Sequence, residues 1–63
     1  MSAELTPYEF QVLRSHWPNP RRESELHARQ AAQKKLSRLG YLRMEGGVYK
    51  VTPEGRQVIE AAR

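Results

Sequence analysis

The chain contains no cysteine, which excludes disulfide bonds and thiolate metal sites and agrees with a reducing compartment. Its two histidines, His16 and His27, are too far apart and too isolated from other ligands to suggest a metal site. No apolar run approaches the length of a membrane span, and the first residues lack the basic and apolar regions of a signal peptide. These absences predict a soluble, cytoplasmic protein without a membrane segment.

Signals of catalysis are also missing. There is no glycine-rich phosphate loop, no nucleophile and base at a useful spacing, and no paired carboxylates with a defined pocket. A chain of 63 residues forms a single domain over 1–63 with a small core and no deep cleft between domains. We therefore expect no enzyme activity and no cofactor.

What the chain does have is an uneven distribution of charge. The net charge is +4, from 11 Lys and Arg against 7 Asp and Glu. Between Leu26 and Met44 there is no acid, whereas there are several bases: Arg29, Lys34, Lys35, Arg38 and Arg43. A basic middle between mixed flanks predicts one positive face.

The first helix has a clear start and stop. Thr6, Pro7 and Glu9 form a capping box with proline in the first turn, and the prolines after Trp17 predict an end near His16 or Trp17. The helix carries a broad apolar arc, which either packs internally or meets another chain: Leu5, Tyr8, Phe10, Val12, Leu13 and Trp17. We expect His16 on the surface and Trp17 as a lid on the core.

Asn19-Pro20 is a second helix start. Ala28, Ala32, Leu36 and Leu39 fall within about 80° of one another on a helix, but Leu26 lies roughly 125° from the centre of that stripe. This favours a short helix over about 20–26, a bend near His27 and a longer helix over about 28–39, which is a helix-turn-helix. A single helix over 20–39 with Leu26 half exposed is the alternative.

Gly40 ends that helix, and Gly46-Gly47 then predicts a two-residue hairpin turn. The turn pairs Glu45 with Val48, and onward to Leu42 with Val51. One sheet face then carries Leu42, Met44, Tyr49 and Val51, and the other carries Arg43, Glu45, Val48 and Lys50. Thr52-Pro53 starts a last helix over about 53–62.

Three stretches, "LSRLGYL", the glycine-tipped hairpin and "YKVTPEG", resemble the winged-helix repressors of bacteria of the MarR and PadR types. The resemblance implies an α+β, mostly α fold: a winged helix-turn-helix with the order helix, short helix, recognition helix, two-stranded hairpin wing and C-terminal helix. The short stretch before the recognition helix implies a truncated second helix. The long terminal helices through which those repressors dimerise have no counterpart in the chain.

The function expected from these features is double-stranded DNA binding by a bacterial or phage transcriptional regulator. The helix over about 28–39 would enter the major groove, with Gln30, Gln33, Lys34 and Ser37 facing outward and Arg29 and Arg38 at the margins. Arg43 and Lys50 face each other across the hairpin, where a phosphate would relieve their repulsion, and Gly46 and Gly47 would allow close approach to the backbone. The competing interpretation is that these polar residues are only a solvated surface.

A second hypothesis belongs to another class. Winged helices also serve as protein-interaction modules, and a fold does not fix a function. A homodimer mate or a partner protein would then dock on the first helix through Leu5, Tyr8, Val12 and Trp17. Charge reversal at Lys34 and Arg38 would abolish DNA binding and leave such docking intact.

Overall fold

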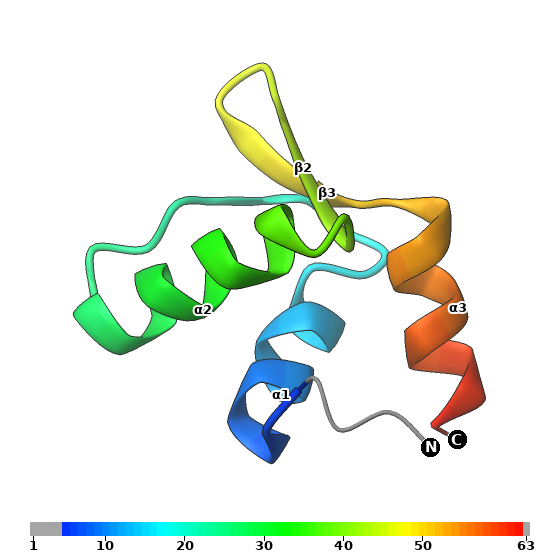
Figure 1. The fold of residues 1–63 in the computed structure, drawn as a ribbon. Helices are drawn as coiled ribbons and strands as arrows, with labels where there is room; N and C mark the ends of the chain where they lie inside the picture. Colours follow the sequence, from blue (N-terminus) through cyan, green and yellow to red (C-terminus); the bar gives the residue numbers. More distant parts are fainter. Residues whose placement is uncertain (1–4, 63) are drawn as a thin grey trace.

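Three helices and a small antiparallel sheet make up the protein, in the order α1 (Pro7–Ser15), β1 (Arg21–Arg22), α2 (His27–Arg38), β2 (Leu42–Glu45), β3 (Val48–Val51) and α3 (Pro53–Ala61). This computed structural model describes residues 5–62. The sheet order is β1-β3-β2, and the β2–β3 hairpin rises away from the three helices (Figure 1). The predicted α+β class is confirmed.

The start of α1 is as predicted. The Thr6 hydroxyl accepts a hydrogen bond from the Glu9 amide at 3.2 Å, and the Glu9 carboxylate accepts one from the Thr6 amide at 3.0 Å. The Glu9 carboxylate also binds Lys35 Nζ at 3.0 Å. The Thr6 amide bond first, and then the Lys35 bond, hold the pKa of Glu9 below its ordinary value. One carboxylate thus caps α1 and ties it to α2.

The short helix expected over 20–26 does not form, and neither does the single long helix over 20–39. Arg21 and Arg22 are extended and pair with Tyr49 and Val48 of β3, so this segment adds a third strand that the sequence reading missed. Leu26 is the N-cap of α2 and is 71% exposed. Leu26 does not lie on the apolar stripe of α2. Its side chain is therefore exposed to solvent, and no separate short helix forms to bury it.

Helix α2 has the predicted length, but its buried face is rotated. Ala32 and Leu36 are buried as expected, whereas Ala28 and Leu39 are exposed. Gln33 is fully buried in their place, and Arg29 is half-buried. At 100° per residue the buried face is shifted by about 50° from the alanine and leucine stripe toward Gln33.

The hairpin register is confirmed, with Glu45 opposite Val48, Met44 opposite Tyr49 and Arg43 opposite Lys50. Gly46 and Gly47 have φ of 59° and 86°, which are the positive angles of a type I′ turn. On the inner face Leu42 and Tyr49 are buried, but Met44 is half exposed. Tyr49 lies on the central strand, whereas Met44 lies on the edge strand near the tip and has a neighbour on one side only.

Every helix and the hairpin contribute to one core: Val12, Leu13, Ala32, Leu36, Leu42, Tyr49 and Ile59. Helix α3 begins at the predicted Thr52 cap, whose hydroxyl accepts a hydrogen bond from the Gly55 amide at 3.0 Å. Gly55 is buried against the backbone, where a Cβ would overlap the carbonyl oxygen of Tyr41. This glycine therefore sets how closely α3 approaches the start of the hairpin.

Candidate nucleic-acid interface

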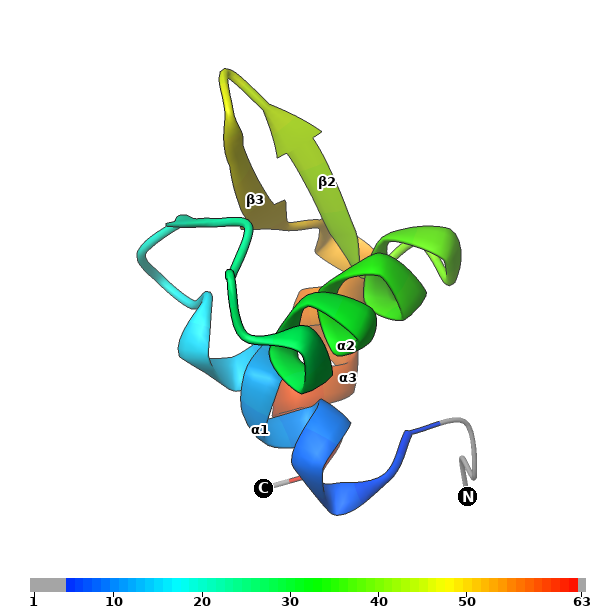
Figure 2. The same cartoon turned by 90° about the vertical axis from the view of Figure 1, so that its left-hand side faces the viewer.

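The outer face of α2 is the side opposite to its buried residues Ala32, Gln33 and Leu36, and Figure 2 looks toward the N-terminal end of this helix, with α3 behind it. The exposed residues of the outer face are His27, Ala31, Lys34 and Arg38. Neither Lys34 nor Arg38 has an ion-pair partner within residues 5–62, and the helix carries no acid. Lys34 and Arg38 are thus two unpaired positive charges one helical turn apart. Such a face attracts an extended polyanion, and a nucleic-acid backbone is one.

Gln33 does not belong to that face, so the prediction that it faces outward was wrong. Its side chain is 0% exposed. The Gln33 Nε2 donates to the Arg22 carbonyl at 3.0 Å, and its Oε1 accepts from the Ser24 amide at 2.8 Å. Gln33 therefore holds the extended segment before α2 in place, and it is not available for a base contact.

His16 is the other residue whose exposure was predicted wrongly. It is 1% exposed and lies between α1 and Gln33. Burial lowers the pKa of His16, and the charges of Arg29 and Arg21 lower it further, while the hydrogen bond to the Val12 carbonyl opposes the shift. The ring is therefore held in the neutral form inside the fold.

Arg29, Gln30 and Ser37, predicted to line the DNA surface, are all half-buried. Arg29 Nη2 donates to the Ser15 hydroxyl at 2.8 Å. Gln30 Nε2 donates to Glu23 at 2.6 Å, and the same carboxylate accepts from the Tyr49 hydroxyl at 3.3 Å. Arg29 and Gln30 thus stabilise the loop and the helix packing, and they mark the edge of the exposed face.

The hairpin carries its predicted cations on the outer sheet face, opposite to the side of Leu42 and Tyr49. Arg43 and Lys50 are directly opposed, but a carboxylate reduces the repulsion between their charges. Glu45 lies 3.0 Å from Arg43 Nε and 3.2 Å from Lys50 Nζ. Gly46 and Gly47 at the tip are exposed, as the prediction of a close approach requires.

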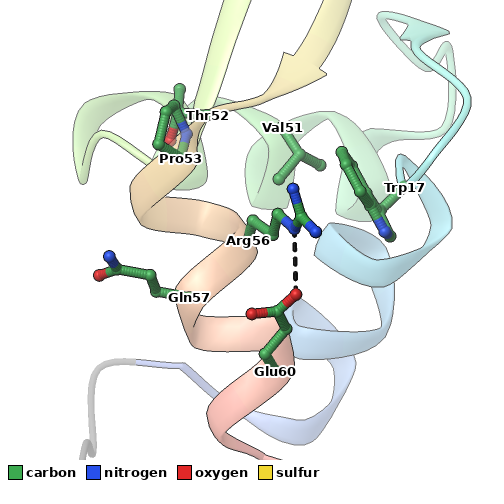
Figure 3. A pocket seen from close by; sticks show the side chains of 7 residues that line it. All are labelled: Trp17, Val51, Thr52, Pro53, Arg56, Gln57 and Glu60. Atoms are coloured by element: carbon green, nitrogen blue, oxygen red, sulfur yellow. Dashed lines mark hydrogen bonds and ion pairs between the residues drawn. The ribbon is translucent and has the colours of Figure 1, made fainter.

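Trp17 is not the core lid that was predicted, because 42% of it is exposed. The Arg56 guanidinium lies 5.0 Å from the centre of its ring and is bound to Glu60 at 3.0 Å. These side chains line an open hollow of about 400 Å³, and Figure 3 shows how they lie between the end of α1 and α3. The cation–π contact occupies one face of the Trp17 ring.

A second hollow, of about 960 Å³, runs between the start of α1 and α3. It is lined mainly by apolar side chains, among them Leu5, Phe10 and Val58. Of the residues predicted to dock a partner, Tyr8 and Trp17 are exposed and Leu5 is half-buried, but Val12 is a core residue and was placed wrongly. Leu5 lines this hollow, Trp17 lines the other one, and Tyr8 lines neither.

Comparisons with protein-family models, curated proteins and solved structures gave no match to this chain. Within residues 5–62 no cluster of His, Asp or Glu is suited to hold a metal ion. In the same part of the chain, no helix combines the length and apolar character that crossing a bilayer requires.

Three residues relevant to the interface were not singled out from the sequence. His27 and Ala31 became part of the exposed face because α2 is rotated about its axis relative to the expectation. Glu45 was placed on the correct sheet face, but its position between two cations was not recognised. The spacing Arg43-x-Glu45, with Lys50 across the turn, was the available signal, because residues two apart share a strand face.

Proposed function

We propose that this protein is a small DNA-binding domain of the winged-helix type that acts as a transcriptional regulator in a bacterium or a phage. The observation that carries the proposal is the outer face of α2, where Lys34 and Arg38 are exposed and unpaired within residues 5–62. The element order and the sheet order β1-β3-β2 support a wing beside a recognition helix. The missing second helix makes it a reduced form of that fold.

In this proposal α2 enters the major groove. A helix of 12 residues is about 18 Å long, and the major groove is about 12 Å wide, enough to admit it. Arg38 has the fork geometry to contact guanine, Ala31 offers a methyl group to thymine, and Lys34 reaches a phosphate. The hairpin tip has no side chains at Gly46 and Gly47, and it would lie against the sugar-phosphate backbone of the DNA.

One domain of this size reads few base pairs. Useful specificity in a genome then needs a second domain, from a homodimer or from another protein in a complex. None of the residues that line the apolar hollow between α1 and α3 belongs to α2, so this hollow is a separate surface that such an assembly could use.

The test is a fluorescence-anisotropy titration of mixed-sequence duplex DNA at two salt concentrations. The wild type should bind, and its affinity should fall steeply with salt because bound counterions are released. The variant Lys34→Gln/Arg38→Gln should bind at least tenfold more weakly. Gln11→Glu/Gln57→Glu changes the net charge by the same amount on exposed positions of α1 and α3 and should bind nearly as the wild type does.

The second candidate is a protein-interaction module without DNA binding. It is favoured by the apolar hollow of about 960 Å³ and by the exposure of Tyr8 and Trp17. Absence of binding by the wild type at low salt would count against DNA binding and leave this candidate, whereas equal losses in the two charge-matched variants would mean that DNA does not bind through the outer face of α2. Sedimentation of the free protein then shows whether a second copy is the partner.

A further inference from the structure

On the outer face of the hairpin, one carboxylate is bound by two cations. Glu45 Oε2 lies 3.0 Å from Arg43 Nε, and Glu45 Oε1 lies 3.2 Å from Lys50 Nζ. Each carboxylate oxygen therefore binds one cation. The side chains of Arg43, Lys50 and Glu45 are 72%, 50% and 42% exposed, so the cluster is open to a ligand in solution.

The strand register produces this arrangement. Arg43 and Lys50 are opposed across the hairpin, and Glu45 lies two residues further along the strand of Arg43 on the same face. Directly opposed like charges disfavour the hairpin, and an acid within reach of both removes the repulsion. Glu45 therefore stabilises the hairpin of the free protein.

A carboxylate and a phosphodiester have a feature in common that matters here. Each offers two anionic oxygens to guanidinium and ammonium donors. The carboxylate of Glu45 lies where a DNA phosphate would have to be placed in order to bind Arg43 and Lys50 together. A phosphate can take that place only if the Glu45 side chain turns away.

We propose that Glu45 is an intrachain competitor for the phosphate site on the hairpin and limits the affinity of this protein for duplex DNA. The inference rests on the proposed DNA-binding function. In the free protein the three side chains carry a net charge of +1 instead of the +2 of the cations alone. Displacing Glu45 breaks two exposed ion pairs, and the freed carboxylate stays close to the bound phosphate and repels it.

The test compares Glu45→Gln with Glu60→Gln in the same anisotropy titration. Glu60 is also a half-exposed carboxylate that pairs with an arginine at 3.0 Å, but it lies on α3. Both variants gain the same net charge. Because exposed ion pairs are weak, Glu45→Gln should bind duplex DNA about three- to tenfold more tightly at low salt. Glu60→Gln should change the affinity less than twofold.

The salt dependence gives a second readout. If phosphate binding in Glu45→Gln no longer displaces an acid, the slope of log K against log salt should steepen by up to about 0.9, which corresponds to one more counterion released. The further change Lys50→Gln in the Glu45→Gln background should remove both the gain in affinity and the steeper slope. Glu45→Thr, which favours a strand, should reproduce the effect of Glu45→Gln and guards against a folding defect.

Three results would overturn the inference while leaving DNA binding in place: Glu45→Gln binds more weakly than wild type, binds equally well, or gains no more than Glu60→Gln. Weaker binding would mean that Glu45 holds Arg43 and Lys50 in position for DNA. If the wild type and both glutamine variants fail to bind at low salt, the proposed function fails, and the role of Glu45 fails with it.

Discussion

Gln33 Nε2 lies 3.0 Å from His16 Nε2, and both side chains are completely buried. The roles of the atoms follow from the surroundings. His16 Nδ1 is 2.7 Å from the Val12 carbonyl, which only accepts, so Nδ1 carries the proton and Nε2 accepts from Gln33. The other Gln33 amide hydrogen goes to Arg22, and the Gln33 oxygen is taken by Ser24. This network joins α1, α2 and β1 and has no place for a second proton on the ring.

Replacing Gln33 by methionine keeps the size and removes the amide. His16 Nε2, the Arg22 carbonyl and the Ser24 amide would then each lose a partner. A buried polar group without a partner costs about 1–3 kcal/mol, so the free energy of unfolding should fall by at least about 2 kcal/mol in a urea titration. Gln30→Met removes only the exposed contact to Glu23 and should cost less than about 1 kcal/mol. Equal losses would mean that Gln33 acts through helix packing alone.

The stability should depend on pH through His16. Its pKa is lowered in the fold, chiefly by burial, so the unfolded chain binds the proton more readily. The stabilisation is complete above the ordinary value of 6.5 and is lost as the pH falls from there toward the folded pKa. In that window the slope should approach about 1.4 kcal/mol per pH unit.

The other groups around His16, and the other titrating groups of the protein, define the controls for this pH dependence of stability. Arg29 of α2 and Arg21 of β1 disfavour the charged ring, and Tyr49 of β3 packs edge-on with its ring centre 6.3 Å away. Glu9 also has a lowered pKa, but its contribution is lost only in the more acidic range below 4.5. Melting temperatures between pH 7.5 and 5 should therefore fall in the wild type and in His27→Gln. A His16→Gln protein that still folds should show a flatter profile.

The Thr52 hydroxyl makes two hydrogen bonds, and a serine variant separates their contribution from that of the Thr52 methyl group. The hydroxyl accepts from the Gly55 amide at 3.0 Å and donates to the Gly40 carbonyl at 2.5 Å. Thr52→Ala loses the cap and the link to the end of α2, and we expect a loss of about 1–2 kcal/mol in thermal or urea unfolding. Thr52→Ser should recover most of it. If serine is as destabilising as alanine, the methyl group and not the hydroxyl stabilises this site.

Gly55 should tolerate no side chain. An alanine Cβ would overlap the Tyr41 carbonyl oxygen and press on Val51, so α3 would have to move away from the hairpin. Overpacking of this kind costs about 1–3 kcal/mol. Gly46→Asn is the control, because the turn at Gly46 is open and asparagine accepts a positive φ. It should change the melting temperature little, and Gly55→Ala should lower it clearly.

The parts of the fold that the sequence predicted are those fixed by local chemistry. Thr6 and Thr52 are helix caps, and the Gly46-Gly47 turn fixes the register of the hairpin. These features depend on residues within a few positions of one another. They could therefore be derived without knowledge of the tertiary structure.

The parts that were missed depend on contacts across the chain. The segment before α2 is extended because β3 pairs with Arg21 and Arg22 and because Gln33 binds its backbone. The prediction counted only apolar side chains and therefore placed the buried face of α2 on the alanine and leucine stripe. A glutamine whose amide groups are all hydrogen-bonded can be buried as completely as a leucine. His16 was misplaced for the same reason. Lys34 was predicted to face outward and is exposed, so that prediction is confirmed, whereas Arg38 was predicted at the margin of the outer face and is exposed as well.

The Gln33 amide also bears on how related chains would differ from this one. It holds the connection between α1 and α2 through three hydrogen bonds, and the connection contains no helix with a hydrophobic face of its own. In a homologue with an equally short connection, positions 16 and 33 should therefore vary together, as a histidine and glutamine or as two apolar residues. In a homologue with several residues inserted there, a helix can supply the missing packing, and the two positions become free to diverge independently.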